Sequence, residues 1–377
     1  MAKLNAVLAL ADGSIYRGMG FGSPGRTSGE LVFDTTMTGY EETLTDPSFG
    51  GQILTMTYPL IGNYGVTDPS KHPERFESDG IQPSGFVVRE ACKEPSHRDS
   101  VKTIHQYLEE NGVPGIEGVD TREITIRIRD EGVMNAALEV AEGEIDAESL
   151  LEEARARPDY SEFDFIQLVS TKKPKFIRAE TCREVSNEGE LSGGKRCVII
   201  DCGMKRSIST RIAERKFDVV VLPYNSTPDD VASFEPRFIM VSNGPGDPLR
   251  ALEPQDTIRK LAPDYPMMNI CMGHQLTGLA LGGSHFKLKF GHRGGNQPVK
   301  DLDRDKVYIT TQNHGFAINP DSLENTGLRV TMTNLNDASI EGMVHQDYRI
   351  MTTQFHPEAT PGPLDANFLF DEFVNSL

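Results

Sequence analysis

The chain has 377 residues, a length that allows two domains with complete hydrophobic cores. Its formal net charge of −18 argues against nucleic acid and anionic membranes as partners, because like charges repel at both surfaces. Five scattered cysteines without a C-x-x-C pair argue against a disulfide framework or a zinc site and favour a reducing compartment, so we expect a cytoplasmic protein.

The N-terminal residues have the pattern of β-structure. Residues 4–10 and 14–17 are expected to form short strands around a turn at Asp12 and Gly13. This early turn leaves too short an apolar run for a secretory leader, and no later run approaches the length needed to cross a bilayer.

Residues 20–25 match the dinucleotide fingerprint G-x-G-x-x-G. That fingerprint must open a helix after a strand, but here it contains Pro24 and leads into the β-favouring residues 30–33. We interpret the segment as a loop between strands and predict no nucleotide site in it.

The remainder of this half contains mixed signals. Residues 34–65 show few helical features, and residues 45–52 taken alone are most simply a polar surface loop. Strands are expected at 52–58 and 85–89, and a helix at 101–110.

Further helices are expected near the end of this half. One begins near Asp120, although the alternation of Ile124, Ile126 and Ile128 would also suit a strand, and another begins after Asp146. We therefore predict that the N-terminal half is a mixed α+β module without a catalytic motif.

Residues 186–194 are polar, small and poor in apolar side chains, as linkers usually are. We therefore predict an N-terminal domain at residues 1–190 and a C-terminal domain at 193–377.

The C-terminal domain alternates buried strands with helices. The expected strands are 195–201, 218–223, 237–242 and 267–270, with helices at 204–215 and 253–262. This alternation predicts an α/β fold: a mostly parallel twisted sheet with helices on both faces, whose ligands lie at the carboxyl ends of the strands. Gly244 and Cys271 both fall at such ends.

Cys271 has the setting of a nucleophile elbow. The strand ending at Ile270 runs into the cysteine, a sharp turn follows at Met272 and Gly273, and residues 274–281 are helical. The field at a helix N-terminus favours a thiolate, and the free N–H groups there can bind an oxyanion. The alternative is an inert buried cysteine.

A candidate base with its own orienting group follows at His356-Pro357-Glu358. Pro357 favours an extended backbone, in which His356 and Glu358 project to the same side. A carboxylate beside an imidazole orients it and stabilises its protonated form. Cys271, His356 and Glu358 are therefore the candidate catalytic residues.

Residues 284–358 are rich in β-strand patterns and contain His292 and His314. We expect hydrogen-bonding roles for these two histidines and predict no metal site, because no Cys or carboxylate stands at ligand spacing beside them. Asp365 is expected to cap a last helix, whose apolar stripe packs on the core.

Residues 193–377 resemble a class I (triad) glutamine amidotransferase domain. Residues 32–40, 44–48 and 118–122 resemble segments of the N-terminal domain of carbamoyl-phosphate synthetase small subunits. The resemblance covers nearly the whole chain. Amidotransferase domains serve many synthases, whereas the N-terminal companion belongs to one.

The resemblance implies hydrolysis of L-glutamine through a cysteinyl thioester on Cys271, with His356 protonating the departing ammonia. It also implies a large synthetase subunit, in a heterodimer or higher oligomer, that makes carbamoyl phosphate from ammonia, bicarbonate and ATP for arginine and pyrimidine synthesis. No cofactor is expected in this chain, because ATP and Mg²⁺ would bind the partner.

The resemblance also implies a set of glutamine-binding residues, with an oxyanion on the N–H groups of Gly244 and Met272. The set is Ser48, Gly244, Gly246, Met272, Gln275, Asn313, Gly315 and Phe316. If Ser48 binds glutamine, residues 45–52 belong to the pocket of the second domain. This expectation replaces the interpretation of residues 45–52 as a surface loop. Asn269 and Ser207 depart from the family's usual Gly and Asn.

Two other functions compete with this one. The chain could be the glutaminase of another ATP-dependent synthase, such as those making GMP or anthranilate, although residues 38–40 and 45–48 argue against it. It could also be a catalytically silent binding subunit in which Cys271 is inert.

Overall fold

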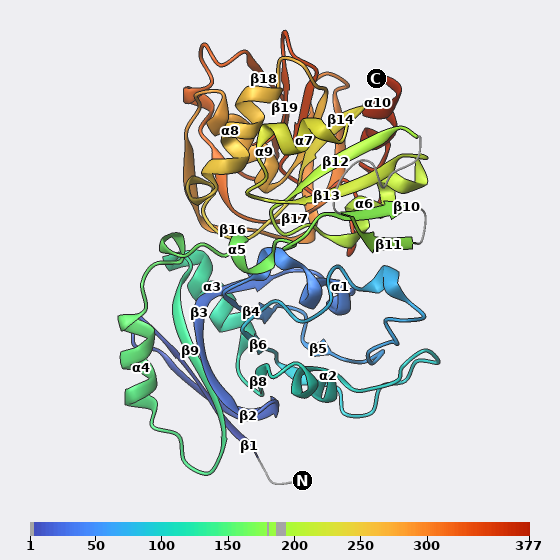
Figure 1. Cartoon of the computed structure of the whole chain (residues 1–377). Coiled ribbons are helices and arrows are strands. Elements are labelled where there is room, and N and C mark those ends of the chain that lie inside the picture. The colour runs from blue at the N-terminus through green and yellow to red at the C-terminus, as the bar shows by residue number, and fades with distance from the viewer. Residues whose placement is uncertain (1–3, 179–180, 186–193) are drawn as a thin grey trace. The chain divides into compact units, whose positions relative to one another are not determined.

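The computed structural model describes residues 4–178, 181–185 and 194–377 (Figure 1). The chain divides into an N-terminal unit, Met1–Phe163 with Lys289–Gly294, and a C-terminal unit, Asp164–Leu288 with Gly295–Leu377. The predicted linker at 186–194 lies outside the described residues except for Gly194, so the boundary at 190–193 stays a prediction. Within the described ranges no helix has the length and apolar character of a membrane span.

In the described part of the N-terminal unit, seven strands close into a barrel in the order β1-β2-β8-β6-β4-β3-β9. They are β1 (Leu4–Leu10), β2 (Ile15–Gly22), β3 (Gly25–Asp34), β4 (Gln52–Met56), β6 (Gly85–Val87), β8 (Pro114–Glu117) and β9 (Met134–Glu142). A separate parallel pair is formed by β5 (Leu60–Ile61) and β7 (Glu90–Ala91). Apolar side chains such as Leu8, Leu31, Ile53 and Leu138 make one core cluster of this barrel. A barrel closed in this way leaves no open sheet edge.

The G-x-G-x-x-G segment was predicted to be a loop between strands, but most of it belongs to the strands themselves. Only residues 23–24 separate β2 from β3, so Gly20 and Gly22 belong to β2. A Cβ atom at Gly20 would come within 2.5 Å of Val140 Cγ1, so a larger residue does not fit there. The glycines therefore serve strand packing.

The helices of the N-terminal unit make it the mixed α+β module that was predicted. They are α1 (Tyr40–Thr45), α2 (Ile104–Glu110), α3 (Thr121–Glu131) and α4 (Ala147–Ala156), with 3₁₀ turns at Pro47–Phe49, Pro73–Arg75 and Tyr160–Glu162. The ambiguous segment after Asp120 is thus a helix, capped by the Asp120 side chain. The helix expected at 101–110 begins only at Ile104, so Val101 precedes α2, and it is 57% exposed.

Residues 45–52 are not a surface loop. Thr45, Asp46, Ser48 and Gln52 are all at most 5% exposed. Asp46 accepts a hydrogen bond from Ser48 N at 2.9 Å, and the Tyr160 hydroxyl donates to Gly50 O at 3.0 Å. These bonds satisfy polar groups that burial would otherwise leave unpaired.

In its described part, the C-terminal unit holds an eleven-stranded sheet in the order β11-β10-β13-β12-β14-β15-β20-β19-β18-β16-β17. The strands are β10 (Lys175–Arg178), β11 (Thr181–Glu184), β12 (Arg196–Asp201), β13 (Asp218–Pro223), β14 (Phe238–Val241), β15 (Met267–Ile270), β16 (His285–Asp301), β17 (Lys306–Ile318), β18 (Leu328–Asn334), β19 (Ile340–His345) and β20 (Ile350–Thr353). The central strands β13, β12, β14, β15 and β20 pair in parallel, and antiparallel strands flank them. The predicted parallel sheet is confirmed at its centre.

Helices cover both faces of this sheet (Figure 1). They are α5 (Ile166–Val169), α6 (Arg206–Glu214), α7 (Pro228–Ser233), α8 (Leu252–Leu261), α9 (Met272–Ala280) and α10 (Phe368–Asn375), with 3₁₀ turns at Pro248–Arg250 and Pro320–Ser322. In β12, Val198 and Ile200 join the cluster that contains α7, α8 and α9, while Cys197 and Ile199 join the one with α6 and α10. Alternate strand residues therefore build two cores, one on each face.

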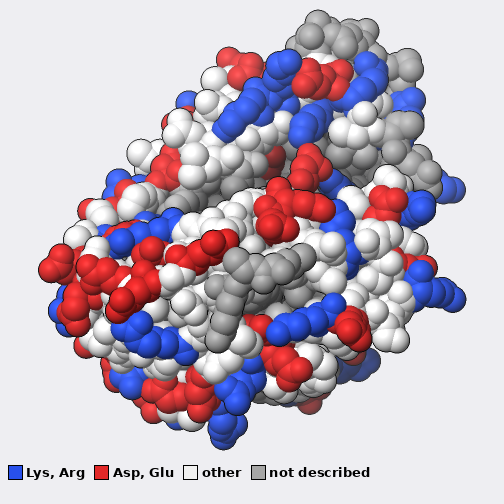
Figure 2. All heavy atoms as spheres, turned by 90° about the horizontal axis from the view of Figure 1, so that it is seen from below, with Lys and Arg blue, Asp and Glu red and all other residues white. Residues whose placement is uncertain are grey.

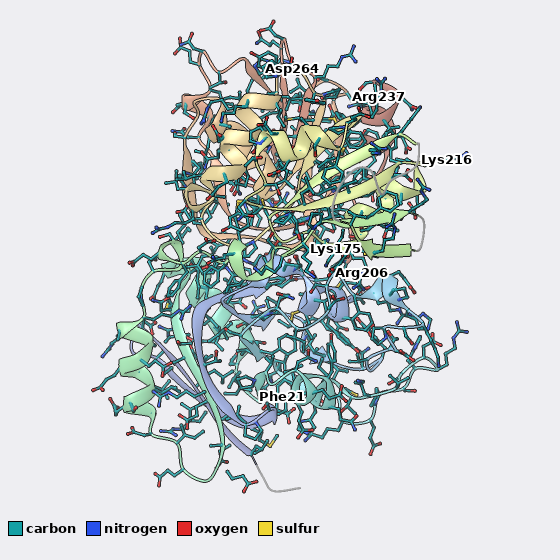
Figure 3. All side chains as sticks on the ribbon, viewed as in Figure 1. Phe21, Lys175, Arg206, Lys216, Arg237 and Asp264 are labelled. Carbon is teal, nitrogen blue, oxygen red and sulfur yellow. The ribbon has the colours of Figure 1, made fainter. Side chains whose placement is uncertain are left out.

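Several local features differ from the predictions. α7 was not predicted, although Thr227 and Asp230 form a capping box at its start. The last helix begins after Asn367, not at Asp365. Lys216, labelled in Figure 3, has a φ of 64° in the tight turn between α6 and β13, where glycine is more usual.

Candidate active site

Cys271 occupies the sharp turn between β15 and α9, as predicted. Its φ is 53° and its ψ is −102°, a conformation that a non-glycine residue rarely adopts. The turn is held by hydrogen bonds from Cys271 N to Thr353 O at 2.8 Å and from Gly273 N to Ser242 O at 3.1 Å. A Cβ atom at Gly273 would lie 2.1 Å from Val241 O, so the turn requires glycine there. The strand–turn–helix geometry of a nucleophile elbow is confirmed.

Asn269 ties the elbow to its neighbours. Its Oδ1 atom accepts a hydrogen bond from Val241 N at 2.8 Å, and its Nδ2 atom donates to Thr277 Oγ1, also at 2.8 Å. The side chain therefore joins β14, β15 and α9 just beneath Cys271. A residue that departs from the family pattern thus adds two buried hydrogen bonds that glycine could not make.

His356 and Glu358 form the contact that was predicted for them, but a turn brings them together instead of the extended backbone that was expected, because Ala359 N donates to His356 O at 3.1 Å. His356 Nδ1 lies 2.5 Å from Glu358 Oε1, and both side chains are almost fully buried. Burial lowers the pKa of His356, but the Glu358 carboxylate outweighs burial and raises that pKa well above its usual value. Burial raises the pKa of Glu358, and the charges of His356 and Lys205 outweigh it and lower that pKa. Both groups are therefore charged at neutral pH.

Lys205 completes this buried cluster and was not selected from the sequence. It is 1% exposed, and its Nζ atom lies 3.2 Å from Glu358 Oε1 and 2.6 Å from Ala359 O. Its backbone N–H donates to Asn243 Oδ1 at 3.0 Å. Lys205 thus links the loop after β14 to the carboxylate that orients His356. In the sequence it looks like any lysine near a helix start, and only its tertiary surroundings distinguish it.

The free nitrogen of His356 is available to the Cys271 sulfur. Nδ1 is engaged by Glu358, while Nε2 is buried and makes no hydrogen bond of ordinary geometry within the described ranges. Interaction with the Cys271 side chain nevertheless contributes to the raised pKa of His356. The Cys271 Sγ atom lies 3.7 Å from Asn313 O. Cys271 thus interacts with His356, and His356 contacts Glu358, which is the order of contacts that a nucleophile–base–orienter triad needs.

Two backbone donors are free near the elbow. Within the part of the chain that the structure describes, the N–H groups of Gly244 and Met272 donate to no other group. Met272 opens α9, so its N–H has no partner inside the helix. A Cβ atom at Gly244 would lie 2.0 Å from Cys202 O, so this position requires glycine. Unpaired donors of this kind can stabilise a developing oxyanion.

Several predicted glutamine-binding residues are connected within the C-terminal unit. Gln275 Nε2 donates to Phe316 O at 2.8 Å and to Gln354 Oε1 at 3.1 Å, which fixes α9 to β17. Asn313, Gly315 and Phe316 are all part of β17. Their binding role stays a prediction.

The remaining predicted positions lie on other segments. Gly246 precedes Asp247, which His285 Nε2 contacts at 3.0 Å. Ser48 belongs to the N-terminal unit. Their roles in glutamine binding also stay predictions.

Other histidines have surroundings unlike those of His356. His274 is fully buried beside Thr352 Oγ1 at 2.8 Å, and burial lowers its pKa to about 3, which keeps it neutral. His314 contacts Phe316 O at 2.8 Å and Gln312 Oε1 at 3.0 Å. The structure brings the buried Glu341 carboxylate within 4.8 Å of ligand atoms of both His292 and His314, so the sequence argument that no carboxylate stands beside them was wrong, and the absence of a metal there stays a prediction.

Comparison with known proteins gives two family matches, one in each half of the chain. Residues 8–138 match the family model of the carbamoyl-phosphate synthase small chain, CPSase domain, and residues 198–376 match that of glutamine amidotransferase class-I. The carbamoyl phosphate synthase small chain of Methanosarcina acetivorans is 48% identical over 367 residues, which cover 97% of each chain. That of Methanopyrus kandleri is 49% identical over 374 residues and 98% of each chain. This chain therefore belongs to the family of carbamoyl phosphate synthase small chains and carries a class-I glutamine amidotransferase domain.

Proposed function

We propose that this chain hydrolyses L-glutamine to glutamate and ammonia and delivers the ammonia to a large synthetase chain, which makes carbamoyl phosphate from bicarbonate and ATP. The observation that carries the proposal is the His356–Glu358 contact of 2.5 Å behind the Cys271 elbow. The matched relatives are small chains of this one synthase, which favours it over other amidotransferase systems.

In the first step, the Cys271 sulfur attacks the side-chain carbonyl carbon of glutamine and a C–S bond forms. The carbonyl oxygen becomes an oxyanion, which the N–H groups of Gly244 and Met272 accept. The C–N bond then breaks, and the leaving nitrogen takes a proton from the His356 imidazolium and departs as ammonia. The raised pKa of His356 supports this role, because the ring holds that proton at neutral pH.

In the second step, water hydrolyses the thioester. His356 Nε2 takes a proton from the water as the oxygen attacks, and the C–S bond breaks to release glutamate and restore the sulfur. Glu358 stays ionised throughout, because His356 and Lys205 hold its pKa low against burial. The carboxylate therefore orients the ring and stabilises its charge without taking the proton.

Binding of glutamine is assigned to Ser48, Gly244, Gly246, Gln275, Asn313, Gly315 and Phe316, as the family resemblance implies. ATP and Mg²⁺ act on the large chain in this scheme, so no cofactor is assigned to this one. A tunnel or channel would carry the ammonia to the large chain.

The test is glutamate release by the wild type and by Cys271→Ser. Loss of the nucleophile should lower kcat by about 10⁴-fold or more. Cys182→Ser is the matched control, because Cys182 is exposed in the same unit and should leave the rate within about twofold. Acid-quenched wild type should carry a glutamyl adduct on Cys271 by mass spectrometry. Equal rates in all three proteins would favour the silent binding subunit.

A further inference from the structure

The outer face of α3 carries an isoleucine where a helix normally presents polar side chains. Ile124 and Ile128 are fully buried in the barrel core, whereas Ile126 is 37% exposed. Arg122 and Arg129 stand four residues before and three residues after Ile126, so the three side chains share one stripe. A single exposed isoleucine is ordinary, and its surroundings decide whether it has a role.

The stripe lines a hollow of about 440 Å³ in the N-terminal unit. Its lining residues are Thr57, Pro59, Arg89, Asp120, Thr121, Arg122, Thr125, Ile126 and Arg129. Three arginines therefore face one aspartate. We call it the α3 hollow.

Other apolar side chains are exposed beside the α3 hollow. A second hollow shares Arg89 with it and is lined by Met19, which is 42% exposed. Tyr58, 38% exposed, stands between Thr57 and Pro59 in the chain. Arginine, aromatic and methionine side chains are enriched in protein–protein interfaces, and here they line, or adjoin in the chain, two hollows that share Arg89.

The arginines of the α3 hollow are only partly satisfied by the chain itself. Arg89 donates to Gly118 O at 3.2 Å and to Val119 O at 3.4 Å, which fixes its position. Arg129 pairs with its exposed neighbour Asp130. Arg122 has no hydrogen bond or ion pair with any residue in the described ranges. An unpaired guanidinium next to a fixed one suits the planar fork that arginine offers to a carboxylate.

The overall charge makes this hollow distinctive. The chain carries −18 net, and Figure 2 shows acidic side chains intermixed with basic ones on the face it draws. A second copy of the chain would bring the same net negative charge, so self-association is opposed at long range. A small inorganic anion would pair with the arginines but leave Ile126, Tyr58 and Met19 uncovered. A protein segment with a carboxylate and an apolar side chain would satisfy both kinds of group.

We propose that the α3 hollow is a docking site for the large synthetase chain, through a segment that brings a carboxylate to Arg122 and an apolar side chain to Ile126. The identity of the partner rests on the proposed function, whereas the chemistry of the segment follows from the hollow. Arg122 and Ile126 are the central contacts, and Arg89 and Arg129 flank them.

The test measures the dissociation constant between the full-length chain and the purified large chain of the same organism, by analytical ultracentrifugation at fixed salt. Arg122→Glu and Ile126→Asp should each weaken binding by about tenfold or more, as central interface residues do. Arg122→Lys keeps the charge and should recover part of the affinity. A circular-dichroism melt checks that each variant is folded.

Two matched controls lie in the same unit but line neither hollow. Arg98→Glu reverses an arginine whose side chain is 89% exposed, and Val101→Asp changes an apolar residue that is 57% exposed. Both should bind within about twofold of wild type, because exposed residues outside an interface contribute little.

Three results would overturn the docking site. They are wild-type affinity in both Arg122→Glu and Ile126→Asp, absence of any wild-type complex with the large chain, and a wild-type homodimer that Arg122→Glu dissociates. Glutamate release is measured on the same isolated variants and should not change. If wild type binds the large chain but hydrolyses no glutamine, the proposed function fails while the docking site stands.

Discussion

The Cys271 region of the C-terminal unit and the α3 hollow of the N-terminal unit treat their charged groups in opposite ways. Around Cys271, the charges of Lys205, His356 and Glu358 are buried and pair with one another. Around the α3 hollow, Arg122 is exposed and has no partner in the described part of the chain. In the Cys271 region, neighbouring charges already determine the protonation states. At the α3 hollow, Arg122 would gain a charged partner only when another molecule binds.

Dielectric environment explains this difference. A buried charge costs several kcal/mol unless it is paired, so each member of the Cys271 region depends on the others. An exposed guanidinium is solvated by water and adds little to stability in either state. Substitutions should therefore disturb catalysis in one region and association in the other.

The strongest test of this contrast is Glu358→Gln. The neutral amide cannot hold the imidazolium, so we expect kcat/KM to fall by about 10³-fold or more. Glu358 raises the pKa of His356 against burial, so its removal should lower that pKa. His356 would then lose its proton at lower pH, and the alkaline limb of the pH–rate profile should move down by about one pH unit or more. An unshifted limb would show that Glu358 does not set the charge of His356.

The matched control is Glu324→Gln, which removes an exposed carboxylate from the same unit. It should leave both the rate and the pH profile within about twofold of wild type. A comparable loss in this variant would point to a general electrostatic effect instead of the triad.

Lys205→Met tests whether the buried cation belongs to the catalytic group. Lys205 lowers the pKa values of both Glu358 and His356, so its loss should raise both and disturb the charge balance of the pair. We expect kcat to fall by about 10- to 100-fold with little change in KM, because Lys205 acts through Glu358. Lys260→Met is the control, since its side chain is 60% exposed. If kcat is unchanged in Lys205→Met, Lys205 has only a structural role.

The elbow and the His356–Glu358 pair could be predicted because local rules govern them. An apolar strand, a cysteine and a Met-Gly turn determine the backbone around Cys271, and the two-residue spacing of His356 and Glu358 predicted their contact, although a turn and not extended chain produces it. The parallel centre of the sheet follows in the same way from strand–helix alternation. These features need only short stretches of sequence.

The features that escaped prediction depend on contacts between distant residues. Closure of the N-terminal barrel requires pairing of β1 with β9, more than a hundred residues later. The strand Met134–Glu142 was not predicted, because it contains three alanines, a residue type that is depleted in strands. Burial of Lys205 likewise follows from Ala359 and Glu358, far away in the sequence. α7 is different, because the capping box at Thr227 is a local sequence pattern from which this helix could have been predicted.

Asn269→Ala tests whether neutral hydrogen bonds also stabilise the Cys271 region. The substitution leaves Val241 N and Thr277 Oγ1 without their buried partner, so the free energy of unfolding should fall by about 1–3 kcal/mol. Urea unfolding measures the change. Asn336→Ala, at an exposed position, should alter it by less than about 0.5 kcal/mol. Equal effects would mean that Asn269 does not brace the elbow.

His274 shows what burial does without a carboxylate. Its pKa is lowered to about 3 by burial, so below pH 6.5 the unfolded chain binds a proton there that the folded chain does not. Its contribution to stability therefore decreases as pH falls from 6.5 toward 3. Between pH 6 and pH 5, wild type should lose about 1 kcal/mol more than His274→Gln in urea unfolding. Parallel pH curves would contradict the neutral state of His274.

The smallest change in unfolding free energy is expected for Ile126→Ala at the α3 hollow, compared with Ile124→Ala on the same helix. Ile124→Ala removes a fully buried side chain from the barrel core and should lower the free energy of unfolding by about 2–5 kcal/mol. Ile126→Ala, two residues further on the same helix, should lower it by less than about 1 kcal/mol, because its side chain already contacts water. If Ile126→Ala proved as costly as Ile124→Ala, folding alone would account for the isoleucine. A small loss of unfolding free energy in Ile126→Ala would leave docking as the reason for an apolar residue on a solvent-exposed helix face.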